Sequence, residues 1–227
     1  MKTNLIILFA GTLFFTACSK KDNSTTPSTT DSTYLNTNAG STWSYHEVDS
    51  SGATPRATDY TVTSSPQDST INGRKYHVYN YSYGGNEYLS FSGNDYYQYD
   101  SIPVSGGINV ERLYLKDNLA AGSTWTQNFV LNIPSIPIPG GITLVATNKI
   151  AEKGISRTVN GKTYSNVTHV STSLATALIL SGFISAIDSY YAPNYGLIES
   201  STLIQLNYLT LSENINIKTQ LMSATLK

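Results

Sequence analysis

Apolar and polar residues alternate along most of the chain, and this alternation predicts β-strands. In one such segment, Trp43 and Tyr45 fall on one face of an extended strand, whereas Ser44 and His46 fall on the other. Thr, Tyr, Val and Ile recur through similar segments, which favours strands. Further strands are expected at residues 58–64, 75–83, 87–91, 95–99, 111–116, 123–131, 142–150, 162–172, 197–206 and 215–226.

One segment and two dipeptides refine this picture. The segment Leu174–Ile187 is apolar and Ala-rich, and its pattern fits a helix or a buried strand equally well. The dipeptides Asn72-Gly73 and Asn160-Gly161 predict hairpins, because both central residues of a type I′ turn need positive φ. We expect a tight first hairpin and a second one with a longer, bulging connection.

Three phrases occur twice in the same order, which indicates two related halves near residues 38–117 and 120–210. The pairs are Ala39–Ser44 with Ala121–Thr126, Ile71–Tyr76 with Val159–Tyr164, and Asp95–Tyr97 with Asp188–Tyr191. The fold class that follows is all-β and antiparallel, with the two halves sharing one core. Either a sandwich or a strongly curved sheet satisfies this pattern.

The N-terminus is typical of an export signal. Lys2 precedes the apolar run Leu5–Phe15, which is too short to span a bilayer as a helix. The phrase Phe15-Thr16-Ala17-Cys18 resembles the lipobox of bacterial lipoproteins. That resemblance implies cleavage after residue 17 and a lipid on the sulfur of Cys18. Ser19, in place of Asp, resembles lipoproteins released to the outer membrane, which is the expected location with either of its faces open.

A tether and a single β domain are expected to follow the signal peptide of residues 1–17. Residues 18–37 hold the lipidated Cys and a flexible stretch, because eight of the twelve residues from 22 to 33 are Ser or Thr. Residues 38–227 are long enough for one all-β domain with its own core. Cys18 is the only Cys, so no intrachain disulfide can form.

Composition excludes one class of partner. Without residues 1–17 the chain has 13 basic and 15 acidic side chains, a net charge of −2. Charged residues are only 13% of the chain, and no basic stripe is present, so no nucleic-acid partner is expected.

A second resemblance lies near the C-terminus. The phrase from Tyr190-Tyr191-Ala192-Pro193-Asn194 to Gly196-Leu197-Ile198-Glu199, together with Gly-Ser-Thr-Trp at residues 40–43, is similar to small Bacteroidota β-lipoproteins of unknown function. The resemblance implies an antiparallel β fold and an envelope location. It implies no activity and no catalytic residues.

Signals for catalysis are poor. The chain has no nucleophile elbow, phosphate-binding loop or zinc-protease motif. Its three His residues, His46, His77 and His169, lie on separate expected strands, although folding can still bring a Ser, a His and an Asp together. We therefore expect no enzyme activity, no metal site and no cofactor.

Tyrosine is the most unusual local feature, since eight of the 17 fall between positions 76 and 99. A period of two places His77, Tyr79, Tyr81 and Tyr83 on one face, as a candidate binding surface. Such a stripe suits a glycan or a protein, and the alternative is a packed core ladder. The leading hypothesis is thus a non-catalytic envelope binding module for a glycan or an envelope protein.

Two further hypotheses stay open. The first is a structural or assembly lipoprotein that contacts other envelope proteins. The second is a carrier that holds an apolar ligand inside a curved sheet. The carrier hypothesis requires a large internal pocket.

Overall fold

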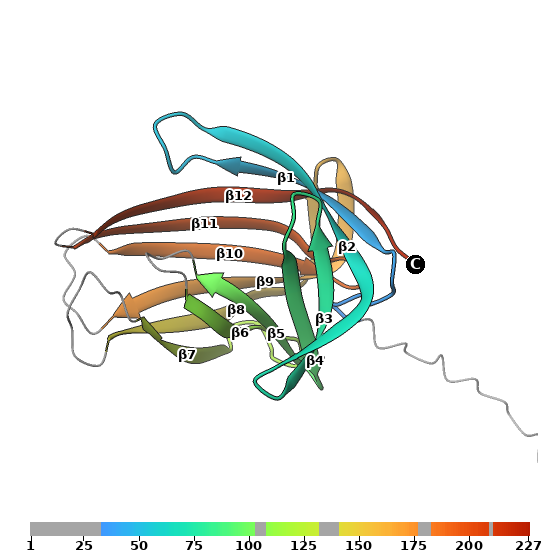
Figure 1. The fold of residues 1–227 in the computed structure, drawn as a ribbon, viewed down its shortest axis with the longest axis horizontal. Coiled ribbons are helices and arrows are strands. Elements are labelled where there is room, and N and C mark those ends of the chain that lie inside the picture. The colour runs from blue at the N-terminus through green and yellow to red at the C-terminus, as the bar shows by residue number, and fades with distance from the viewer. Residues whose placement is uncertain (1–32, 103–107, 132–140, 177–182, 209–210) are drawn as a thin grey trace, which may run out of the picture. The chain divides into compact units, whose positions relative to one another are not determined.

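The computed structural model describes residues 33–102, 108–131, 141–176, 183–208 and 211–227 (Figure 1). These residues form strands and turns, and none of their segments is a helix long and apolar enough to cross a membrane. The strands are β1 (Thr42–Asp49), β2 (Arg56–Ile71), β3 (Arg74–Tyr81), β4 (Asn86–Ser92), β5 (Asp95–Ile102), β6 (Ile108–Lys116), β7 (Thr124–Leu131), β8 (Ile142–Val159), β9 (Lys162–Thr176), β10 (Ile184–Ala192), β11 (Gly196–Tyr208) and β12 (Leu211–Thr225).

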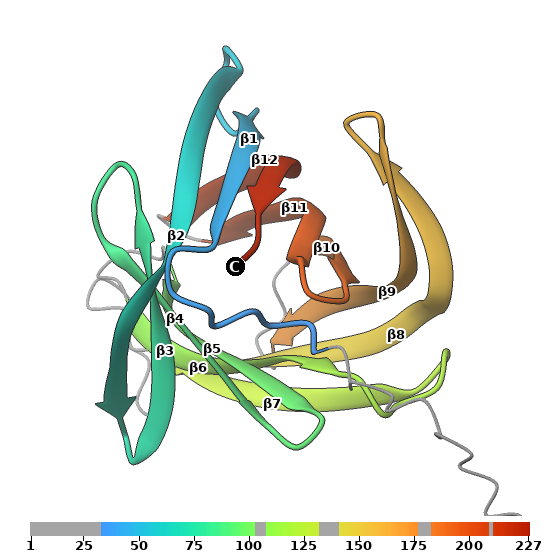
Figure 2. The same cartoon turned by 90° about the vertical axis from the view of Figure 1, so that its right-hand side faces the viewer.

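All of these strands belong to one antiparallel sheet. Its order is β6-β5-β4-β3-β2-β1-β12-β11-β10-β9-β8-β7, so two meanders of six strands meet where β1 pairs with β12. The sheet curls strongly, and its end strands β6 and β7 approach each other (Figure 2). The all-β, antiparallel prediction is confirmed, and of the two expected architectures the structure has the curved sheet.

The gap between β6 and β7 is bridged by side chains, and we call this junction the seam. Trp125 Nε1 donates a hydrogen bond to the carbonyl of Leu113 at 2.9 Å. Gln127 bonds to the backbone of β6 twice, through its side-chain amide. The curved sheet is therefore nearly closed without a continuous backbone ladder.

The Asn-Gly turns have the predicted conformation. Asn72 and Asn160 have φ values of 50° and 48°, and Gly73 and Gly161 have 81° and 77°. The expected longer connection in the second hairpin is wrong, because β8 runs to Val159 and the turn follows directly. Irregular pairing does occur, but within β8, where the register shifts at three places.

The repeated Ala-Gly-Ser-Thr-Trp phrases also share one local structure. Gly40 donates its N–H to the carbonyl of Ser64 at 2.8 Å, and Gly122 donates to Ile150 at 2.7 Å. Both glycines have positive φ, 83° and 90°. Each phrase thus turns the chain into a strand in the same way.

The ends of the ambiguous segment Leu174–Ile187 are extended. Residues up to Thr176 complete β9, and β10 begins at Ile184, so both ends are strand. Residues 177–182, which complete that segment, lie outside the described residues.

Candidate functional site

The concave face of the sheet lines a cavity of about 370 Å³, which we call the tyrosine chamber. Its lining comes from β1 to β6, from β10 to β12, and from the segment that precedes β1. The tyrosines of this lining are Tyr34, Tyr45, Tyr60, Tyr79, Tyr81, Tyr114, Tyr191 and Tyr195.

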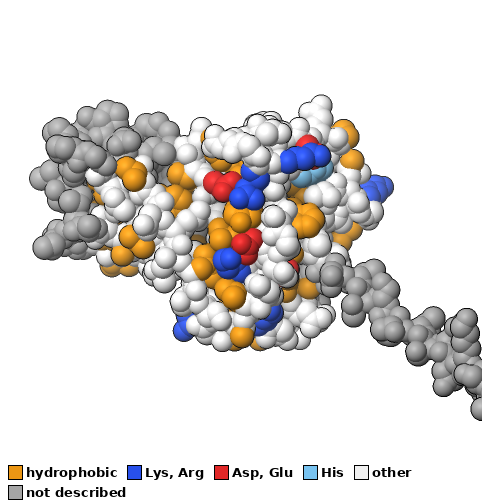
Figure 3. Space-filling model, turned by 90° about the horizontal axis from the view of Figure 1, so that it is seen from below, with side chains coloured by type: hydrophobic (Ala, Val, Ile, Leu, Met, Phe, Trp, Pro, Cys, Tyr) orange, Lys and Arg blue, Asp and Glu red, His pale blue; other side chains and the backbone are white. Residues whose placement is uncertain are grey.

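A second cavity of about 270 Å³ adjoins it, and we call this one the apolar chamber. Its apolar lining includes Phe129, Leu144, Ala146, Val170, Leu174, Ile187, Ile204, Ile215 and Ile217. The two chambers share Asp100, Arg112, Tyr114, Ile187, Ser189, Tyr191 and Thr202. The interior of the sheet therefore passes from a polar, aromatic region to an aliphatic one. Apolar side chains with charged ones among them are visible in the middle of one face (Figure 3).

One end of the tyrosine chamber is crossed by the segment of residues 33–41, which we call the strap (Figure 2). The Tyr34 hydroxyl lies 2.9 Å from Thr168 Oγ1, and the Tyr79 hydroxyl donates to the carbonyl of Asn36 at 2.7 Å. Gly196 has a φ of 68°, and a Cβ at this position would lie 3.2 Å from the Tyr34 carbonyl oxygen. The apolar chamber lies away from the strap, toward the C-terminal ends of β7 and β9, because Phe129 and Leu174 are each two residues from those ends.

A chain of polar side chains lines the part of the tyrosine chamber formed by β4 to β6, which we call the chamber floor. Gln98 Nε2 donates to Glu87 Oε1 at 2.9 Å, and Arg112 donates to Gln98 Oε1. The Arg112 guanidinium also lies 3.9 Å from the carboxylate of Asp100. Register explains this arrangement, because Gln98 pairs directly with Arg112 across β5 and β6.

Glu87 is the most perturbed carboxyl of this chain of contacts. Desolvation inside the sheet is the main cause that raises its pKa to about 7, and the nearby Asp100 carboxylate adds to the shift. Arg112 and hydrogen bonds from Tyr81 and Gln98 act in the opposite direction. Glu87 therefore changes its charge near neutral pH. Part of the Glu87 side chain remains accessible and lines the tyrosine chamber.

Four aromatic rings form a cluster beside Glu87. Tyr60 stacks on Tyr45 with centroids 5.5 Å apart, and it meets Tyr81 edge-on at 5.8 Å. Tyr81 stacks in turn on Tyr83 at 4.9 Å. Burial, together with the Glu47 and Glu87 carboxylates, raises the pKa of Tyr60, so this phenol remains protonated.

The predicted stripe is divided by the structure. Tyr79 is only 2% exposed and packs edge-on against Trp43, whereas Tyr83 is 67% exposed. Tyr81 lies between these extremes and lines the tyrosine chamber. His77 contacts the Tyr79 ring but bonds away from the chamber, to Ser64 and Asp68. Their role in binding stays a prediction, and two of the four, Tyr79 and Tyr81, line the tyrosine chamber.

The structure does bring a Ser, a His and an Asp together. Ser64 Oγ lies 2.8 Å from His77 Nε2, and His77 Nδ1 lies 2.9 Å from Asp68 Oδ1. Ser64 is only 1% exposed, so a substrate carbonyl cannot reach its hydroxyl in this conformation. The pairing of β2 with β3 shifts register between Ser64 and Asp68, and His77 bonds to both residues that flank this bulge. We infer that these three side chains stabilise the bulge in β2.

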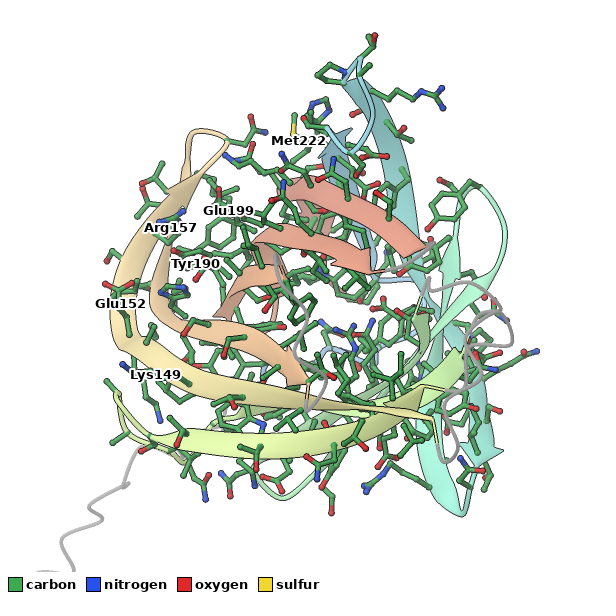
Figure 4. All side chains as sticks on the ribbon, turned by 90° about the vertical axis from the view of Figure 1, so that its left-hand side faces the viewer. Lys149, Glu152, Arg157, Tyr190, Glu199 and Met222 are labelled. Carbon is green, nitrogen blue, oxygen red and sulfur yellow. The ribbon has the colours of Figure 1, made fainter. Side chains whose placement is uncertain are left out.

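A second polar cluster, formed by side chains of β8 to β11, lies outside both chambers. Arg157 donates to Glu199 from Nε at 2.8 Å, and its guanidinium carbon lies 3.9 Å from the centre of the Tyr190 ring. These three labelled side chains gather beside the curled end of β8 and β9 (Figure 4). Tyr190 stacks on His169 at 4.2 Å. The cluster fastens the β8–β9 hairpin to β10 and β11.

Metal ligation has no candidate group in the described part of the chain, where no three His, Cys, Asp or Glu side chains are placed to hold an ion. Cys18 lies outside the described residues.

Sequence reasoning missed the polar residues of the chamber floor. Glu87, Gln98 and Arg112 are isolated along the chain, and only the strand register brings them together. One signal was available. Glu87 shares a strand face with Leu89, as Arg112 does with Tyr114, so charged residues occupy positions at which alternation predicts a packed interior.

Comparisons with known proteins give two solved structures of similar shape. One is a protein of Parabacteroides distasonis assigned as a lipoprotein, with a TM-score of 0.44 and 12% identity over 85% of this chain and 98% of that chain. The other, from Bacteroides fragilis, is assigned as an exported protein with a YmcC-like fold, with a TM-score of 0.45 and 11% identity over 84% and 98%. No family model and no curated protein matches the chain.

Proposed function

We propose that this protein is a non-catalytic, lipid-anchored envelope protein that holds a small amphipathic molecule inside its curved sheet. Anchoring is supported by the sequence alone. The only Cys stands directly after a short apolar run, in a phrase that resembles a lipobox. An acylated Cys carries more than one chain, as stable anchoring requires.

The adjoining chambers are the observation that carries the binding proposal. The tyrosine chamber and the apolar chamber share a wall, and the larger of them lies within the usual volume of small-molecule pockets. A molecule with a polar head and an aliphatic tail matches both environments at once. This favours the carrier hypothesis, modified so that the ligand has a polar head.

A flat surface for a glycan or a protein has less support. Of the three tyrosines in the stripe, only Tyr83 is largely exposed, while Tyr79 is in the core and Tyr81 lines the chamber. Catalysis also lacks support, because the hydroxyl of Ser64 is buried.

Calorimetric titration of the mature chain from residue 18, with Cys18→Ser in place of the lipidated residue, tests this proposal. The ligands are three dodecyl amphiphiles below their micelle-forming concentrations: dodecyltrimethylammonium, dodecyl maltoside and dodecanoate. We expect saturable binding of at least one of them at one molecule per chain. If none of the three binds, the proposal is wrong.

Two matched variants locate the binding. Ala146→Phe fills part of the apolar chamber and should lower the affinity about tenfold or more, because the tail loses its space. Ala57→Phe places the same ring on an exposed position of β2 and should leave the affinity unchanged. Equal affinities for both variants, with melting temperatures near that of the parent, would place the ligand outside the chamber.

A further inference from the structure

The charges that line the two chambers are unbalanced. Among the described lining residues, the acidic ones are Glu47, Glu87 and Asp100, and the basic one is Arg112. The segments outside the described residues that connect the strands, 103–107, 132–140, 177–182 and 209–210, contain no charged residue. The described lining of the two chambers is thus net negative whether or not Glu87 carries a proton.

The positive charge of Arg112, the one basic residue of the described lining, is already compensated. Arg112 donates to Gln98 Oε1 and lies 3.9 Å from the Asp100 carboxylate. An anionic head that approached Arg112 would meet the Asp100 carboxylate at the same place, and the two like charges would repel each other. A carboxylate or phosphate head is therefore disfavoured.

Aromatic rings stand beside the acidic groups. Tyr45, Tyr60 and Tyr81 line the chamber, and Glu87 acts electrostatically on all three phenols. The face of an aromatic ring attracts cations, and the attraction grows when the site is shielded from water. Rings and carboxylates placed together in this way suit an ammonium group.

We infer that the head group of the bound molecule is a cationic amine, held in the tyrosine chamber beside Glu87, while its alkyl chain occupies the apolar chamber. The inference rests on the proposed function and specifies its ligand. Tyr45, Tyr60 and Tyr81 supply ring contacts, and Glu87 supplies the counter-charge. Ser189 and Thr202 lie in the wall that the two chambers share, where head and tail would join.

The test compares head groups on one tail. The mature chain with Cys18→Ser is titrated at pH 8 with dodecyltrimethylammonium, dodecyl maltoside and dodecanoate, each below its micelle-forming concentration. We expect the ammonium to bind about tenfold or more tightly than the other two. Equal or tighter binding of dodecanoate or the maltoside would overturn the inference but leave the proposed function intact, whereas binding of none would remove both.

A pair of variants identifies the counter-charge. Glu87→Gln keeps the shape and the bond to Gln98, and it should weaken ammonium binding about fivefold while leaving maltoside binding unchanged. Glu152→Gln makes the same change outside both chambers and should alter neither. Unchanged ammonium binding by a folded Glu87→Gln chain would also overturn the inference.

Discussion

The side-chain carbonyl of Gln127 accepts a hydrogen bond from the backbone N–H of Leu113 at 2.9 Å. The amide nitrogen of the same side chain donates to the carbonyl of Glu111 at 2.8 Å. One glutamine on β7 thereby takes the place that a peptide group of a neighbouring strand would hold. It satisfies two backbone groups at the edge of β6 that would otherwise lack a partner at the seam.

Replacing this glutamine should open the seam. Gln127→Met keeps the length of the side chain but leaves both backbone groups of β6 without their partner. We expect a loss of about 1–3 kcal/mol in the free energy of unfolding, measured by urea denaturation. Gln67→Met, at an exposed position of β2, should change it by less than about 0.5 kcal/mol. Similar losses for the two variants would show that the seam does not depend on Gln127.

The Ser64, His77 and Asp68 triad should act in stability and not in catalysis. His77→Gln disturbs the bonds on both sides of the bulge in β2, so the unfolding free energy should fall by about 1–3 kcal/mol. His46→Gln, which touches an exposed pair with Asp59, should cost less. A fluorophosphonate probe should leave Ser64 unlabelled, because its hydroxyl is buried. Labelling that disappears in Ser64→Ala would contradict this.

The raised pKa of Glu87 makes stability depend on pH. Its pKa is about 7 in the folded chain against an ordinary value of 4.5, so the folded state retains this proton where the unfolded state has lost it. Tyr81 from β3, Gln98 and Asp100 from β5 and Arg112 from β6 face this carboxyl. The contribution of Glu87 to the free energy of unfolding should therefore fall as the pH rises from 4.5 to 7.

Glu87→Gln removes this dependence because glutamine has no proton to lose. Relative to the parent chain, the variant should gain about 3 kcal/mol of unfolding free energy between pH 4.5 and pH 8. Urea denaturation at the two pH values measures the gain. A difference between variant and parent that is the same at both pH values would show that Glu87 titrates normally.

Anchoring through Cys18 predicts a change of cell fraction. In a bacterial host that processes lipoproteins, the parent chain should incorporate an alkynyl palmitate analogue and sediment with membranes. Cys18→Ser should lose the label and appear in the soluble fraction, whereas Ser19→Ala should behave as the parent. Membrane association of Cys18→Ser would show that another feature holds the chain there.

The strands and turns were predictable because their signals are local. Alternation around Trp43 and Tyr45 and the Asn-Gly turns at 72–73 and 160–161 each depend on a few neighbouring residues. The extent of the curvature and the seam were not predictable, since the hydrogen bond that Leu113 donates to Gln127 joins the two end strands of the sheet. Nothing local in the sequence specifies how far a twelve-stranded sheet will curl.

The site was partly predictable in the same sense. The density of tyrosines drew attention to β3, and Tyr79 and Tyr81 do line the chamber. Period two fixed which residues share a face, but it did not distinguish a concave face from an exposed one. Glu87 and Arg112 became part of a site only through the register of β3 to β6.

The fluorescence of the two tryptophans tests the central claim most directly, because Trp43 lines the tyrosine chamber and Trp125 bonds across the seam outside both linings. Saturation with dodecyltrimethylammonium should shift or quench the emission of a Trp125→Phe chain, in which Trp43 reports, and leave that of a Trp43→Phe chain unchanged. Binding seen by calorimetry with no change at Trp43, or with an equal change at Trp125, would show that the ligand does not enter the curved sheet.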